Sequence, residues 1–103
     1  MALAQYQVSE LPESPLEASA AFFAEHLDAA RSVACGGDLL IILPSAGPDH
    51  AEWRQAVARD MARDAAPSRV NVIGAGDQAQ KETLIRYLAD AKGVTGHYSQ
   101  TND

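Results

Sequence analysis

The sequence predicts a small layered α/β domain with a parallel sheet of about four strands and three helices. Short apolar runs, typical of strands, alternate along the chain with longer segments whose apolar residues recur every three or four positions, typical of helices. The run Leu39–Leu43 is apolar throughout, which indicates a strand buried on both faces of a parallel sheet. With 103 residues, one domain is expected. We therefore expect the order β-α-β-α-β-α-β, right-handed crossovers and a strand order that follows the chain.

The first strand is predicted over residues 3–8, where apolar and polar residues alternate. A loop leads from it to a helix over 14–35. Ser14 is a good N-cap, Pro15 suits the first helical position, and Glu17 completes a Ser-x-x-Glu capping box.

The apolar residues of this helix form two adjoining stripes. One stripe contains Leu16, Ala20, Phe23, Leu27 and Ala30, and the other contains Phe22, Ala29 and Val33. Together they make an apolar arc that is wider than one sheet face is expected to cover. The helix is expected to end at Gly36 and Gly37, because glycine suits a left-handed C-cap.

The central strand ends at Pro44, and a tight loop leads to a second helix over 49–66. Asp49 and Glu52 form a second capping box, and Pro67 ends the helix. Its apolar face carries Trp53, Val57 and Met61, spaced four residues apart.

The third strand is predicted over residues 69–73, and the turn after it is predicted over the glycine-rich segment 74–76. A third helix is expected to begin at Asp77, or at the glycine before it, and to close at Lys92 and Gly93.

A last short strand is predicted over 94–98, and residues 99–103 are expected to fray. The sequence contains no internal repeat and no low-complexity linker. Residues 1–103 are therefore interpreted as a single domain.

The composition argues against several classes of partner. The net charge of −6 and the scattered basic residues are unsuited to nucleic acid, whose phosphates need neutralising. No apolar run approaches the roughly 20 residues of a membrane span, and no signal peptide is recognisable. The single Cys35 cannot form an internal disulfide, so a cytoplasmic protein is expected. Twenty alanines and the excess of arginine over lysine indicate a GC-rich bacterial genome.

Residues 36–98 resemble the C-terminal half of the short-chain dehydrogenases/reductases. Gly36–Ser45 is similar to the fifth strand of that family, which begins after a glycine and ends at the catalytic serine. Arg69–Asp77 is similar to its arginine-valine-asparagine strand and the turn that follows. Shorter similarities lie in Ala56–Asp64, Leu88–Asp90 and Val94–Gly96. The resemblance implies a truncated Rossmann-like domain.

The chain differs from that family at the family's catalytic and cofactor-binding positions. Gly47 and Ala51 fall near the positions of the family's catalytic tyrosine and lysine, and no segment replaces its N-terminal glycine-rich turn. Hydride transfer needs an acid and a cation that lowers the pKa of that acid. His50 with Arg54 is a poor local substitute. We therefore expect a pseudoenzyme, with no catalytic residues and no bound cofactor.

The segment Gly74, Ala75, Gly76 and Asp77 also fits the start of a dinucleotide fingerprint that follows a strand and opens a helix. NAD(P) or another nucleotide is the cofactor that this alternative implies. Against it, the Asp77 carboxylate would repel phosphate, and no acidic residue lies at the ribose-binding position. The simpler interpretation is a glycine turn that ends in an aspartate cap.

Ser45 and His50 are weak candidates for a minimal catalytic pair, since a nucleophilic serine needs a base within reach. His26, His50 and His97 lack the spacing of metal ligands, so no metal site is predicted.

Alanine-rich helix faces allow close packing, and the resembling family pairs the two corresponding helices with those of a second subunit. We therefore predict a homodimer through helices 14–35 and 49–66. The leading hypothesis is a non-catalytic interaction or regulatory module, and an unknown protein partner stays open. The alternatives are a nucleotide- or small-ligand-binding domain and a minimal enzyme.

Overall fold

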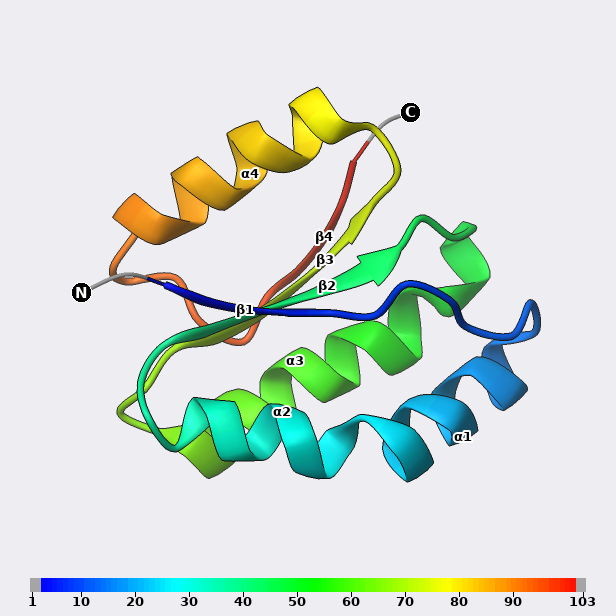
Figure 1. Cartoon of the computed structure of the whole chain (residues 1–103), viewed down its shortest axis with the longest axis horizontal. Helices are drawn as coiled ribbons and strands as arrows, with labels where there is room; N and C mark the ends of the chain where they lie inside the picture. The colour runs from blue at the N-terminus through cyan, green and yellow to red at the C-terminus, as the bar shows by residue number, and fades with distance from the viewer. Residues whose placement is uncertain (1–2, 102–103) are drawn as a thin grey trace.

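The computed structural model describes residues 3–101, which form one four-stranded parallel sheet with helices on both faces (Figure 1). The strands are β1 (Ala4–Gln7), β2 (Leu39–Pro44), β3 (Val70–Ala75) and β4 (Tyr98–Gln100), and they lie in chain order. The helices are α1 (Pro15–Glu25), α2 (Leu27–Ala34), α3 (Ala51–Ala65) and α4 (Gln78–Asp90), with a 3₁₀ turn, η1 (Pro48–His50), before α3. The predicted α/β class and parallel sheet are confirmed.

The first predicted helix is two helices with a kink at His26, so the predicted count of three helices was wrong and the described residues contain four. The helical hydrogen bonds continue past the kink, from His26 N to Phe22 O and from Ala30 N to His26 O, both at 2.9 Å. The His26 Nδ1 lies 2.9 Å from the Tyr6 hydroxyl on β1, which ties the bend to the sheet. The N-terminus of α1 is capped as predicted, because Ser14 Oγ accepts a hydrogen bond from Glu17 N at 3.1 Å.

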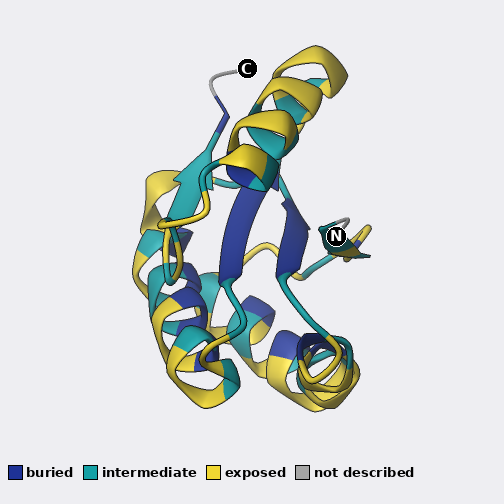
Figure 2. Cartoon of the chain, turned by 90° about the vertical axis from the view of Figure 1, so that its left-hand side faces the viewer, coloured by how far each residue is buried: buried dark blue, intermediate teal, exposed yellow. Residues whose placement is uncertain are grey.

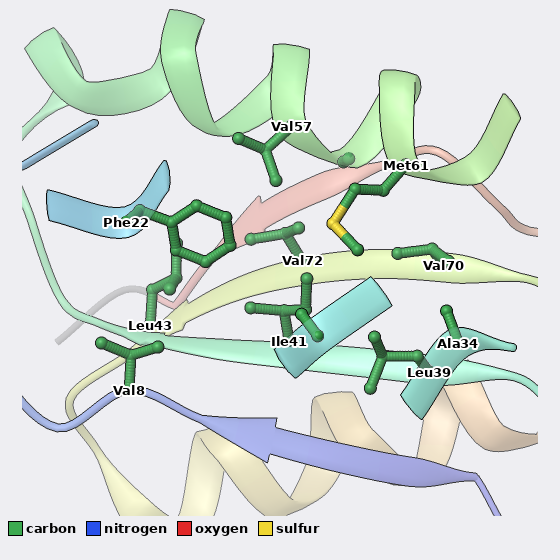
Figure 3. Close-up of a cluster of buried hydrophobic side chains, with 12 residues drawn as sticks. Val8, Phe22, Ala34, Leu39, Ile41, Leu43, Val57, Met61, Val70 and Val72 are labelled. Carbon is green, nitrogen blue, oxygen red and sulfur yellow. The ribbon is translucent and has the colours of Figure 1, made fainter. Parts of the chain in front are cut away.

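Two hydrophobic clusters occupy the two faces of the sheet, and β2 and β3 lie buried between them (Figure 2). Alternate residues of β2 explain this, because Leu39, Ile41 and Leu43 point to one face and Leu40 and Ile42 to the other. Figure 3 shows the larger cluster, which buries side chains of α1, α2 and α3 against the sheet. The smaller cluster lies under α4.

The crossover through α4 departs from the predicted right-handed connections. Strand order follows the chain, yet α1, α2 and α3 cover one face and α4 the other (Figure 1). The first two crossovers are right-handed and the third is therefore left-handed. The face that a right-handed crossover would need is already covered by α3, whose Gln55 side chain binds Gly96 O at 2.8 Å and Tyr98 N at 3.3 Å.

Two predicted strand boundaries were wrong. Gly74 and Ala75 belong to β3 rather than to the turn, and pair with β2. The last strand begins at Tyr98. Residues 94–97 form the segment before it, in which Gly96 N donates to Val70 O at 2.7 Å and His97 O accepts from Val72 N at 2.9 Å. The Asn71 side chain donates to Val94 O at 3.0 Å and accepts from His97 N at 3.1 Å.

The second capping box and the frayed end were also predicted incorrectly. Asp49 lies inside η1, and no side chain caps the N-terminus of α3. Residues 99 and 100 are in β4 and Thr101 is buried, whereas 102–103 lie outside the described residues. Among the helices of residues 3–101, none has the length and apolar character needed to cross a membrane.

At the amino ends of the strands, Asp38 and Arg69 form a hydrogen-bonded clamp. The Asp38 carboxylate accepts from Arg69 N at 2.7 Å and from Arg69 Nε at 2.9 Å. Arg69 Nη1 also donates to Leu88 O at 3.0 Å and Ala91 O at 2.7 Å, at the end of α4. The hydrogen bond from Arg69 N, and next the one from the Arg69 side chain, hold the pKa of Asp38 below its usual value.

Candidate functional site

A cavity of about 880 Å³ lies at the carboxyl ends of β1 and β2, the edge where ligands bind in open parallel sheets. Two loops form most of its wall, one after β1 and one after β2, and η1 and α3 contribute the remainder. Its lining residues are Ser9, Glu10, Leu11, Pro12, Glu13, Pro44, Ser45, Ala46, Gly47, Asp49, His50 and Arg54.

Arg54 is the charged residue buried deepest in this region, at 1% exposure. Its Nη1 donates to Pro44 O at 2.9 Å and to the Tyr98 hydroxyl at 3.3 Å. The guanidinium lies over the rings of Trp53 and Tyr98, at 5.4 and 5.8 Å from their centroids. Within residues 3–101, Arg54 Nε has no hydrogen-bond partner and no carboxylate forms an ion pair with this side chain.

Gln100 joins Ser45 to Tyr98 at the same edge of the sheet. The Tyr98 hydroxyl donates to Gln100 Oε1 at 2.8 Å, and Gln100 Nε2 donates to Ser45 Oγ at 2.8 Å. Two hydroxyl groups and a cation therefore gather within one network, with the Gln100 amide between the hydroxyls. In carbonyl chemistry, such hydroxyls would have to converge on a substrate oxygen.

His50 is buried and both of its ring nitrogens have partners. Trp53 Nε1 donates to His50 Nδ1 at 3.1 Å, and His50 Nε2 lies 2.9 Å from Glu13 O. An indole nitrogen can only donate and a carbonyl oxygen can only accept, so Nδ1 is the acceptor and Nε2 the donor in these two hydrogen bonds. In this arrangement His50 joins the loop after β1 to the start of α3, and its nitrogens are not directed at Ser45.

The predicted nucleotide segment is divided between two elements. Gly74 and Ala75 are the last residues of β3, Gly76 lies in the turn, and Asp77 is the N-cap of α4 without a side-chain capping bond. A Cβ atom on Gly74 would collide with the side chains of Gln100 and Arg54. The glycine is therefore needed for the close approach of this chain's own side chains, which leaves a pyrophosphate little room there.

The other candidate acids and cations lie elsewhere. The lysines of the chain, Lys81 and Lys92, lie in α4 and just after it, across the sheet from α3. Tyr6 binds His26, and Tyr87 is 59% exposed on α4. Gly47 lies before η1 and Ala51 begins α3. Within residues 3–101 no cluster of three or more His, Cys, Asp or Glu residues could hold a metal ion.

Sequence reasoning missed Tyr98 and Gln100 and gave Arg54 too little weight. The signal for Arg54 was present, because the buried residues of α3 are Arg54, Val57, Ala58 and Met61. A charged residue in phase with an apolar stripe is unusual enough to mark a site. No comparable signal existed for Gln100, since its role depends on where β4 begins.

Comparison with known proteins agrees with this architecture. The family model for short chain dehydrogenase-like proteins matches residues 6–101. The match begins in β1 and ends just after β4, and so extends the resemblance noted for residues 36–98 to the first strand and helix. No curated protein and no solved structure matches the chain. The chain therefore belongs to the short chain dehydrogenase-like family.

Proposed function

We propose that this chain is a non-catalytic member of its family that acts as an interaction module and forms a homodimer. The observation that carries the proposal is the position of the Gln100 amide. It lies between the hydroxyls of Ser45 and Tyr98 and hydrogen-bonds to both. A substrate carbonyl would need the space that this amide fills.

The acid-base groups near Ser45 support the same proposal. His50 Nδ1 accepts from Trp53 Nε1 and Nε2 lies against Glu13 O, so neither ring nitrogen is directed at Ser45 as a base. Gly47 and Ala51 stand near the positions where the related enzymes carry tyrosine and lysine. We expect purified protein to show no turnover in carbonyl-reductase and esterase screens. Turnover that Ser45→Ala abolishes would refute the non-catalytic proposal.

The surface of α1 supports the homodimer. Leu16 is 81% exposed and Phe23 is 50% exposed, and Ala20 and Ala24 beside them are exposed as well. These four residues, which we call the α1 stripe, face away from the sheet while Ala18 and Phe22 face it. An exposed apolar stripe with small residues at its centre allows a second helix to approach closely.

Charges on the neighbouring helices α2 and α3 favour a second copy as the occupant. The outer surface of α3 carries Arg59, Asp60 and Arg63, and Asp64 pairs with Arg31 of α2 at 3.0 Å. Basic and acidic residues thus alternate on one surface. A twofold interface pairs a surface with itself, and a surface of mixed charge can do so without net repulsion.

Sedimentation equilibrium on wild type and Phe23→Asp tests the homodimer. A twofold axis places each substituted residue in the interface twice, so we expect the dimer dissociation constant to rise about 100-fold or more. Tyr87→Asp is the matched control, because Tyr87 is 59% exposed, slightly more than Phe23, but lies on α4. A monomeric wild type at tens of micromolar, or dissociation by Tyr87→Asp alone, would overturn the proposed interface.

A further inference from the structure

We propose that the cavity at the carboxyl ends of β1 and β2 binds a small zwitterion, with its carboxylate at Arg54 and its ammonium at Glu10, Glu13 and Asp49. This goes beyond the interaction module, since the cavity is a ligand site separate from the α1 stripe. It also differs from the predicted nucleotide segment at Gly74–Asp77.

The first argument for this site is the buried charge of Arg54. The side chain is 1% exposed, and arginine cannot relieve the cost of burial by losing its proton. Buried charges in proteins are normally paired with an opposite charge. Within residues 3–101 this guanidinium has only neutral acceptors and two aromatic faces, and its Nε is unpartnered. A buried guanidinium whose described partners are all neutral favours the binding of an anionic ligand.

The position of Arg54 indicates where that anion comes from. The residue forms part of the wall of the cavity, so an anion that enters there meets the guanidinium. The N-terminus of the 15-residue helix α3 lies at the same wall without a side-chain cap, and its dipole adds to the attraction for negative charge. A carboxylate also matches the fork of the guanidinium.

The remaining charged side chains in the wall select the kind of anion. Glu10, Glu13 and Asp49 are exposed carboxylates that line the same cavity. Three negative charges against one positive charge repel a phosphate or a nucleotide. They attract a ligand whose second group is an ammonium. The cavity volume of about 880 Å³ suits a small molecule.

Three organic probes of similar size, 4-aminobutanoate, butanoate and butylamine, and a fourth probe, inorganic phosphate, test this site in ¹⁵N-labelled protein. We expect 4-aminobutanoate to shift the Arg54 Nε–H resonance and the Gly47 and His50 amides with saturation. Butanoate is expected to bind about three- to tenfold more weakly, because it lacks the ammonium, and butylamine and inorganic phosphate should cause no shift at these resonances.

Two variants locate the two ends of the ligand. Arg54→Met is expected to weaken 4-aminobutanoate binding about 10- to 100-fold, whereas Arg59→Met, on the same helix but half-exposed, leaves it unchanged. Glu10→Gln/Glu13→Gln in the exposed loop is expected to remove the preference for 4-aminobutanoate over butanoate. This second variant keeps the test valid even where Arg54→Met does not fold.

Three results would overturn the proposal. No saturable shift with either carboxylate would make Arg54 a structural cation held by Trp53 and Tyr98. Tighter binding of phosphate than of 4-aminobutanoate would refute the selection by the acidic wall. Equal binding to wild type and Arg54→Met would place the carboxylate elsewhere. Each result is independent of the sedimentation experiment on the α1 stripe, so the two proposals can fail separately.

Discussion

Arg69 and Arg54 occupy opposite edges of the same sheet and differ in how their charges are balanced. At the amino ends of the strands, Arg69 binds the Asp38 carboxylate and two carbonyls at the end of α4. At the carboxyl ends, Arg54 is more deeply buried but donates only to a carbonyl and a hydroxyl. At the amino edge, the arginine charge is balanced by a carboxylate within the described chain. At the carboxyl edge, no described carboxylate balances the charge of Arg54.

The difference separates a structural role from a binding role. The clamp of Asp38 and Arg69 joins β2, β3 and α4, so its bonds are formed whenever the domain is folded. Arg54 instead keeps an unbalanced charge beside a cavity, which costs stability in the free protein and favours an anionic ligand. Sites that bind are often kept at the expense of local stability.

Arg69→Met should have the largest effect on stability, because it removes the clamp. The substitution leaves the Asp38 carboxylate without its cation and takes one donor from each of Leu88 O and Ala91 O, the second of which still accepts from Val94 N. We expect the free energy of unfolding to fall by about 3 kcal/mol. Urea denaturation followed by circular dichroism measures this. A loss below about 1 kcal/mol would mean that water replaces these bonds and that the two edges do not differ as argued.

Acid should weaken the amino edge, and Asp38→Asn should remove part of that sensitivity. The pKa of Asp38 is lowered in the folded protein, first by the hydrogen bond from Arg69 N. Its stabilising contribution is therefore complete above the unfolded value of about 3.9 and is lost as the pH falls through the lower folded value. Asp38 is 37% exposed, so solvent screening limits the contribution to about 1 kcal/mol.

Urea midpoints of wild type and Asp38→Asn, measured from neutral pH down to about pH 3, test this. The difference in stability between them should shrink as the solution becomes acidic. The same series on Arg54→Met is the control, and it should follow the wild-type pH dependence. A difference that stayed constant down to the lowest pH would show that the Asp38 carboxylate does not supply the effect.

Much of the fold follows from local patterns. The apolar run Leu39–Leu43 predicts a strand buried on both faces, and Ser14 with Pro15 predicts where α1 begins. The side of the sheet on which α4 lies could not be predicted this way. It depends on Gln55 of α3 binding the backbone of residues 96 and 98, a contact between segments distant in sequence. The kink at His26 similarly depends on Tyr6.

The site was less predictable than the fold because its members come from separate elements. Ser45 and His50 were identified from their residue types, yet the partners that define their roles are Gln100, Trp53 and Glu13. Those partners meet only after the strands are aligned at their carboxyl ends. Gly74 illustrates the difficulty, because a glycine required by neighbouring side chains has the same sequence signature as one required by a phosphate.

Arg54→Met should have the smallest effect on the ligand-free protein, although Arg54 is the more deeply buried of the two arginines. The substitution loses two hydrogen bonds, each worth about 1 kcal/mol, and the contacts with Trp53 and Tyr98. It also removes a desolvated charge that has no counter-ion among residues 3–101, and the cost of such a charge is several kcal/mol before relaxation. Because these terms oppose each other, we expect the free energy of unfolding to change by less than about 1 kcal/mol. Urea denaturation beside Arg69→Met makes the comparison direct. A loss as large as that of Arg69→Met would mean that neutral partners balance the Arg54 charge fully, and the contrast between the two edges would disappear.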